Sequence, residues 1–397
     1  MFPNFLRHHR FFCDKEMNEM YLSVFIMNLA ESMISIFVPI YLFSLNYSVV
    51  SILLFFLIGY IGNVIFAIPI AKIVAKIGAK HAVLLSAPFL IAYYFGLRVL
   101  PEFSWLFFIL PFGITGRALL YNFGFELNFL DHFDKKKVGG QLSTLAILSI
   151  MSTVLSPLIA GLIIAYFGYG VIFVIGSIIL FISTLPLFVS NDCKHGLDFT
   201  LKDITKIFTT RKSANILLSF SGYAIESSIG RNIWPVFLII TFGAVQKVGY
   251  AAAIAAFLTV AVIAATGKLS DKYNTKKLLN FGTMFYFFSW LGCLLADTAF
   301  KTFIANSYRS VTERFLLLPW QSLLYKIVNR ENYFRLTVLQ DMTFNASRVL
   351  ILPFIMLIFI INYYPYQISF IIAALFTLLY PLLNKAGNDD INNLPNP

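Results

Sequence analysis

Residues 48–71 read SVVSILLFFLIGYIGNVIFAIPIA, a run of 24 residues without a single charged side chain. A helix of this length is long enough to cross the hydrocarbon core of a bilayer, which is about 30 Å thick. Similar apolar runs recur along the chain from Tyr21 to Pro381. Strands of membrane β-barrels alternate apolar and polar side chains, whereas these runs are continuously apolar. The sequence therefore predicts an all-α membrane protein.

Composition agrees with this interpretation. Apolar residues make up 59% of the 397 residues and charged residues only 12%, about half the charged share of soluble domains. We expect twelve spanning helices. They are placed near residues 21–44, 48–71, 82–100, 103–129, 141–167, 169–190, 215–242, 246–266, 278–296, 302–326, 336–361 and 365–384.

The basic residues predict the orientation of these spans. Of the 30 Lys and Arg, 22 fall at the termini or in the even-numbered loops, three in the odd-numbered loops, and five inside spans. Because basic loops stay in the cytoplasm, both termini are expected there, in a protein of the plasma (cytoplasmic) membrane. The net charge of +11 is thus explained by topology, and we expect membrane lipid rather than nucleic acid as its partner.

An intramembrane enzyme is the rival class, and the sequence argues against it. The five histidines lie in or beside predicted cytoplasmic segments, and neither H-E-x-x-H nor G-x-S-x-G occurs. The three cysteines show no pairing pattern. We therefore expect no enzymatic activity, no metal site, no catalytic residue and no cofactor.

Two sets of six spans repeat at an offset of 196 residues. Pro39 falls on Pro235, Pro157 on Pro353, and Arg117 on Glu313. Six spans per set bring both sets in from the same side, so the repeat is parallel, with a pseudo-two-fold axis along the membrane normal. The predicted domains are an N-terminal six-helix bundle (1–190), a cytoplasmic linker (191–214) and a C-terminal six-helix bundle (215–397).

The loop after the eighth predicted span reads GKLSDKYNTKK over residues 267–277. It resembles the signature loop of the major facilitator superfamily, G-x-x-x-D-[RK]-x-G-x-[RK]-[RK], and departs from it only at Asn274. The resemblance implies a gating role for Gly267, Asp271 and Lys272, with Asp271 capping a helix of the opposite half near Gly139. The first-half copy, residues 71–81, is degraded and lacks the aspartate at Ala75.

A second, weaker resemblance lies in the fifth span. Ser152, Ser156, Pro157, Ala160 and Gly161 stand where the antiporters of this family have G-x-x-x-G-P-x-x-G-G. Two interpretations remain open, a tightly packed helix seam or the signature of an exporter.

Ten charged residues lie inside the predicted spans. They are Glu31, Arg117, Glu126, Glu226, Arg231, Arg309, Glu313, Arg314, Asp341 and Arg348. Each would cost roughly 2.5–3.5 kcal/mol at the centre of a bilayer, so we expect them to face one another or a wet cavity. They occupy the first, fourth, seventh, tenth and eleventh spans, and the resemblance implies that helices one, four, seven and ten line the central cavity.

Glu31, Arg117 and Glu226 lie near the midplane, where transporters bind their substrates. A carboxyl group in an apolar cavity favours its protonated form, so either glutamate is a candidate proton carrier. We predict a binding site for substrate or protons with these members: Asn28, Glu31, Arg117, Tyr121, Tyr223, Glu226, Arg231, Arg309 and Glu313.

Alternative pairings remain open for the interior charges. Arg309 and Glu313, four residues apart, share a helix face and can pair with each other, while the repeat also allows Arg117 to pair with Glu313 across the cavity. Arg314, Asp341 and Arg348 can form a fixed network. Each of the two midplane glutamates can be neutralised by Arg117, by Arg231 or by a proton.

The resemblance implies a secondary active transporter, expected to be a monomer, that moves a small polar or ionic solute by alternating access. Proton coupling and facilitated diffusion both remain open. The alternatives are a proton-driven exporter of drugs and other amphipathic compounds, and a non-transporting receptor or scaffold of the same fold.

Overall fold

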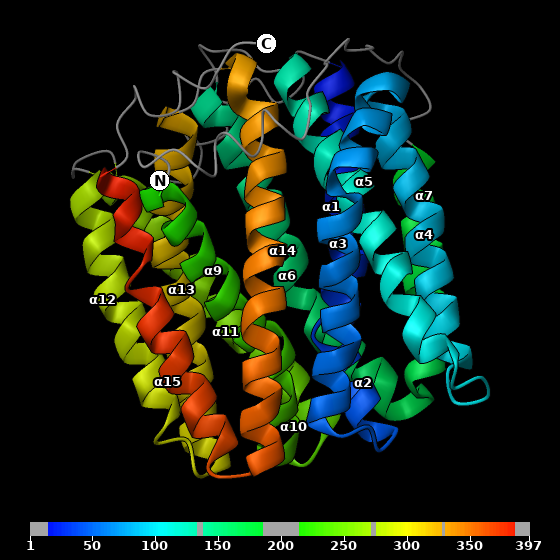
Figure 1. Cartoon of the computed structure of the whole chain (residues 1–397), viewed down its shortest axis with the longest axis vertical. Coiled ribbons are helices and arrows are strands. Elements are labelled where there is room, and N and C mark those ends of the chain that lie inside the picture. The colour runs from blue at the N-terminus through cyan, green and yellow to red at the C-terminus, as the bar shows by residue number, and fades with distance from the viewer. Residues whose placement is uncertain (1–14, 133–137, 186–213, 271–274, 328–329, 386–397) are drawn as a thin grey trace, which may run out of the picture.

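The computed structural model describes residues 15–132, 138–185, 214–270, 275–327 and 330–385, and Figure 1 shows them as one bundle of long helices. The helices of the first half are α1 (Lys15–Ile34), α2 (Phe37–Ser44), α3 (Val49–Ile77), α4 (Ala79–Val99), α5 (Leu106–His132), α6 (Val138–Phe167) and α7 (Tyr169–Thr184). Those of the second half are α9 (Ala214–Asn232), α10 (Trp234–Phe242), α11 (Val245–Ser270), α12 (Thr275–Cys293), α13 (Ala299–Ile327), α14 (Arg330–Ile361), α15 (Pro365–Thr377) and the 3₁₀ helix η3 (Tyr380–Lys385). The all-α prediction is confirmed.

Each of the twelve predicted spans coincides with one helix or with two consecutive helices. By length and apolar composition, however, only six segments in the described ranges qualify as membrane spans, or seven with the bent pair Ala214–Phe242 and Val245–Val260. Interior charges are one reason why the other helices do not qualify. For example, α13 carries Arg309, Glu313 and Arg314 within one helix. The protein is an integral membrane protein, and the number of twelve spanning helices stays a prediction.

Prolines at equivalent positions of the repeat interrupt equivalent helices. α1 ends at Ile34 and α2, with Pro39, begins at Phe37; α9 ends at Asn232 and α10, with Pro235, begins at Trp234. Proline has no N–H to donate and its ring clashes with the carbonyl four residues earlier, so each helix breaks just before it. Pro157 and Pro353 lie inside α6 and α14.

The two halves meet along a small number of helix pairs. α14 packs on α3 and α11 packs on α6, while α2 contacts α10 at one end of the bundle. In the repeat, α3 corresponds to α11 and α6 to α14, so exchanging the halves turns the first pair into the second. The packing therefore has the pairing that a two-fold axis requires. The predicted linker 191–214 lies almost wholly outside the described residues, and the domain boundaries stay predictions.

Large apolar side chains are exposed on most helices of the bundle, among them the four that correspond to the third, sixth, ninth and twelfth predicted spans. Examples are Phe89 and Phe95 on α4, Phe181 on α7, Phe281 and Phe288 on α12, and Leu375 on α15. Contiguous exposed apolar surface of this kind marks contact with lipid. These four spans therefore contribute to the outer face, together with parts of helices that carry interior charges, such as Leu350 and Phe354 of α14.

Candidate functional site

The first-half charges come together on α1 and α5. Arg117 Nη2 forms an ion pair with Glu31 Oε1, and the Arg117 guanidinium lies 4.3 Å from the ring centre of Tyr121. The Arg117 side chain is only 8% exposed, whereas that of Glu31 is 29% exposed. Asn28, one turn before Glu31, is half-buried. The structure thus brings Glu31, Arg117 and Tyr121 together and neutralises the first midplane glutamate with an arginine, one of the two predicted outcomes.

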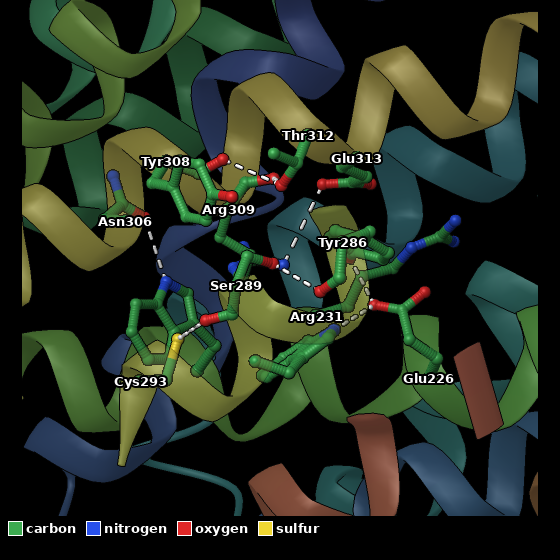
Figure 2. A network of polar contacts seen from close by, with 12 residues as sticks. Glu226, Arg231, Tyr286, Ser289, Cys293, Asn306, Tyr308, Arg309, Thr312 and Glu313 are labelled. Carbon is green, nitrogen blue, oxygen red and sulfur yellow. Dashed lines mark hydrogen bonds and ion pairs between the residues drawn. The ribbon is translucent and has the colours of Figure 1, made fainter. Parts of the chain in front are cut away.

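Glu226 on α9 has a different environment, and Figure 2 shows its contact with Tyr286. Its Oε1 accepts hydrogen bonds from the Tyr286 hydroxyl at 2.5 Å and from Trp290 Nε1 at 3.2 Å, and its Oε2 accepts from the Tyr380 hydroxyl at 2.8 Å. The residue is 2% exposed. In the described residues no arginine forms an ion pair with it, so three neutral donors hold this carboxyl group inside the second half. Neutralisation of Glu226 by an arginine, one of the predicted alternatives, is therefore not observed, and neutralisation by a proton stays a prediction.

Arg309 on α13 lies beside this group. Its Nη1 is 3.8 Å from Glu313 Oε2, and its guanidinium lies 5.2 Å and 5.0 Å from the ring centres of Trp234 and Trp290. Cation–π contacts of this kind stabilise a desolvated guanidinium. Glu313 remains 31% exposed. The same-helix pair is confirmed, and the alternative pair between Arg117 and Glu313 is not formed, because each residue has a partner in its own half.

A polar group that sequence reasoning missed joins the two halves. Asn63 Nδ2 on α3 donates to Asn345 Oδ1 on α14 at 3.4 Å, and Asn232 Nδ2 at the end of α9 donates to the Tyr60 hydroxyl at 3.2 Å. The Cζ atom of Arg348 also lies over the Tyr60 ring, 5.0 Å from the ring centre. The available signal was a single asparagine in the uncharged run 48–71, with Tyr60 one helical turn before it.

Tyr223 and Arg231 also come together on α9. Arg231 Nη2 donates to the Tyr223 hydroxyl at 2.9 Å, and the Tyr223 ring stacks on Trp320 at a centroid distance of 5.3 Å. Arg231 is exposed although it lies mid-span.

The predicted network of Arg314, Asp341 and Arg348 is formed in part. Asp341 and Arg348 are joined through Asn345, which donates to Asp341 Oδ2 at 3.0 Å and accepts from Arg348 Nη1 at 3.4 Å. Arg314 is exposed on α13 and stands apart from them.

The expected gate falls largely outside the described residues, which exclude Asp271 and Lys272. Gly267 lies near the end of α11, where only the backbone is described. In the first-half copy, Gly78 has φ +100° between α3 and α4. Glycine adopts this conformation without strain, so its retention in the degraded loop has a backbone reason.

The fifth-span pattern lies in a tight contact between the halves. The Cα atom of Gly249 on α11 lies 3.2 Å from where a β-carbon on Gly161 of α6 would stand, and a β-carbon on Gly249 would lie 2.7 Å from the Pro157 carbonyl oxygen. Small residues are needed here for the helices to approach. The contact agrees with the packing interpretation of the pattern.

Solved structures share this fold over nearly the whole chain. A D-xylose–proton symporter has a TM-score of 0.70 at 13% identity, covering 91% of this chain and 96% of its own. A bacterial homologue of the iron transporter ferroportin in the outward-facing state scores 0.68 at 11% identity, covering 94% and 99%. A POT family transporter in complex with 5-aminolevulinic acid scores 0.69 at 12% identity, covering 93% and 94%. At these identities the likeness establishes the fold.

Residues 127–298 match the family model of the Major Facilitator Superfamily. Over this stretch the chain is similar to the major facilitator superfamily. No curated protein sequence matches it significantly. The chain has the ion pairs Glu31–Arg117 and Arg309–Glu313 within its halves and the Tyr60 and Asn63 contacts between them. Within the described ranges, no three His, Cys, Asp or Glu side chains are grouped as metal ligands.

Proposed function

We propose that this protein is a member of the major facilitator superfamily and a secondary active transporter, which carries a small polar or ionic solute across the membrane by alternating access. One observation carries the proposal. Glu31 and Glu313 lie mid-span, yet their side chains remain 29% and 31% exposed inside a bundle whose outer helices expose apolar residues. Charges at this depth are costly in lipid, so such groups border water or a polar solute.

The solved structures of similar fold support a small polar solute as well. The D-xylose–proton symporter and the POT family transporter bound to 5-aminolevulinic acid both handle small polar solutes. We extend the comparison only to the class of solute. The protein is proposed to lie in the plasma (cytoplasmic) membrane as a monomer with both termini in the cytoplasm, following the positions of its basic residues.

Proton coupling is proposed to run through Glu31. A carboxyl group that exchanges protons needs contact with water, and the Glu31 side chain has it, while Glu226 is buried and held by three donors. Arg117 would release Glu31 on protonation, since the ion pair then loses its charge attraction.

Uptake into proteoliposomes tests the proposal. Purified protein is reconstituted and offered labelled succinate, phosphate, D-xylose, a dipeptide and a divalent cation, each with and without an inward proton gradient. We expect uptake of at least one solute above that of protein-free liposomes, saturating with concentration. A complete absence of uptake for all five solutes, with the protein correctly folded and inserted, would contradict the proposal.

A non-transporting receptor or scaffold is the second candidate function. The ion pairs formed within each half favour it. Glu31–Arg117 and Arg309–Glu313 are each satisfied within one half, so part of the interior is already occupied by its own charges. A receptor would show ligand-dependent stabilisation without uptake, whereas a scaffold would show neither.

A further inference from the structure

Apart from Arg314, which is exposed on α13, the interior arginines fall into two classes by their partners. Arg117 and Arg309 each pair with a glutamate of their own half. Arg231 and Arg348 have no carboxylate oxygen within 4.0 Å among the described residues. An arginine kept charged and uncompensated inside a membrane protein is costly. Two of them in one place therefore require an explanation.

Arg348 on α14 is surrounded by neutral acceptors. It donates to the Ala224 carbonyl, to Asn345 Oδ1 and to Ser227 Oγ at 3.4, 3.4 and 3.3 Å. These are long hydrogen bonds, and none goes to a charged acceptor. The side chain is nonetheless well buried, since Arg348 is 7% exposed. Its charge is held in place without being neutralised.

Arg231 lies on the face of α9 that carries Ser227. Its guanidinium reaches back two turns to the Tyr223 hydroxyl, and Ser227, which accepts from Arg348, stands midway between Tyr223 and Arg231 on this face. Both guanidinium groups therefore donate to the same stretch of α9, to Tyr223 from Arg231 and to Ala224 and Ser227 from Arg348. Unlike Arg348, Arg231 is exposed, so an incoming solute can reach it.

Two tyrosine hydroxyls complete the group, and one of them comes from the other half. The Tyr223 hydroxyl accepts from Arg231 and the Tyr60 hydroxyl accepts from Asn232, so each keeps its own proton for a further acceptor. Tyr60 also lies against the Arg348 guanidinium. Donors from α3, α9 and α14 thus converge where the two halves meet.

The carboxyl groups around these two arginines have other partners. Asp341 is joined to Arg348 only through the side chain of Asn345, and Glu226 is held by Tyr286, Trp290 and Tyr380. Glu313 lies 3.8 Å from Arg309 Nη1. Among the described residues, none of the three carboxyl groups forms an ion pair with Arg231 or Arg348. A negative charge supplied from outside the chain is the missing complement.

We infer that Arg231 and Arg348, with the hydroxyls of Tyr60 and Tyr223, form the binding site for a small oxyanion, the carboxylate or phosphate group of the transported solute. The inference rests on the proposed transport function and narrows its substrate to anions. Guanidinium groups present forked donors that match the oxygens of carboxylate and phosphate. Because Tyr60 belongs to the first half and both arginines to the second, a bound anion bridges the halves.

Thermal unfolding of the purified full-length protein tests the site. Sodium phosphate, succinate and citrate are compared with sodium chloride at equal ionic strength and with D-xylose. We expect at least one oxyanion to raise the Tm in a saturable manner beyond chloride, because a ligand that binds only the folded state stabilises it. Arg231→Gln and Arg348→Gln should each weaken the apparent affinity about tenfold or more, which corresponds to about 1.4 kcal/mol.

Matched variants separate the site from general charge effects. Lys247→Gln removes one exposed positive charge at the start of α11 and should keep the response, while Tyr223→Phe, which retains the stacking on Trp320, should weaken it. If Arg348→Gln does not fold, Arg348→Lys replaces it and should also bind more weakly. The inference is overturned if no oxyanion stabilises the protein beyond chloride, or if Lys247→Gln loses the response as fully as Arg231→Gln.

The two proposals can fail separately. Uptake of D-xylose or a cation without any stabilisation by oxyanions would leave the transporter standing and remove the anion site. Arginine-dependent stabilisation by phosphate, with no uptake of any solute into proteoliposomes, would keep the site and remove the transporter.

Discussion

At the scale of single residues, two glutamates that look alike in the sequence have different surroundings. Glu31 and Glu226 both lie mid-span and both precede a serine. In the structure, Glu31 is paired with Arg117 and partly exposed, while Glu226 is buried and satisfied by three neutral donors. A proton carrier must meet water on both sides of the membrane in turn, so only the first is suited to that role.

Replacing each glutamate by glutamine tests this difference. Glu31→Gln mimics the protonated form and should abolish accumulation driven by a proton gradient while solute exchange continues. Glu226→Gln should keep the coupling but lower the free energy of unfolding by about 1 kcal/mol, because an amide nitrogen replaces the Oε2 acceptor and the Tyr380 hydroxyl must then accept instead of donate. Accumulation and exchange are measured in proteoliposomes, and unfolding by thermal denaturation.

Glu102 provides the control, since it is exposed in the loop between α4 and α5. Glu102→Gln should leave both coupling and stability unchanged. Normal gradient-driven accumulation in Glu31→Gln would remove Glu31 as the carrier, and loss of coupling in Glu226→Gln alone would reverse the assignment.

At the scale of helices, small residues and prolines decide how the elements meet. Pro39 and Pro235 break equivalent helices, and Gly161 of α6 and Gly249 of α11 allow two backbones from opposite halves to touch. The neighbours of Gly249 are backbone atoms, which cannot rotate away as a side chain can. Any β-carbon at this position must therefore push the helices apart.

Gly249→Ala is the corresponding prediction. A β-carbon there would lie 2.7 Å from the Pro157 carbonyl oxygen, and overpacking of this kind costs about 1–3 kcal/mol. Gly292→Ala on α12 is the matched control, because a β-carbon at Gly292 meets nothing within 4 Å. We expect a lower Tm and reduced transport for the first variant and an equal or higher Tm for the second. Equal stability of the two would show that the contact is not tight.

The sequence allowed the elements to be predicted better than their side-chain partners. Long uncharged runs and paired prolines are local signals, so the all-α fold, the equivalent breaks and the outward apolar helices could be read directly. The Arg309–Glu313 pair could also be predicted, because four residues on one helix fix the geometry. Tyr286, Trp290 and Tyr380 could not be assigned to Glu226, since they belong to α12 and η3, which only tertiary packing brings within reach of α9.

At the scale of the whole molecule, apolar, charged and neutral polar residues lie in different parts of the fold. Helices with apolar exposed faces form the outside, ion pairs stabilise each half internally, and the contacts between halves depend on neutral polar residues such as Asn63 and Asn345. Neutral hydrogen bonds are weaker than charge-assisted ones, and the bond between these two residues is 3.4 Å long. An interface of this kind can open while each half remains intact, as alternating access requires.

The most direct test of alternating access measures two distances between spin labels on cysteine-replaced protein. One pair, Ser44 on α2 and Ile240 on α10, reports on the end of the bundle where these helices meet; the other, Lys76 on α3 and Lys277 on α12, reports on the opposite end. All four positions are exposed. Double electron–electron resonance in lipid nanodiscs should show two populations for each pair, with one end widening as the other narrows when a transported solute is added. Distances that stay fixed at both ends, or that widen and narrow together, would contradict the account.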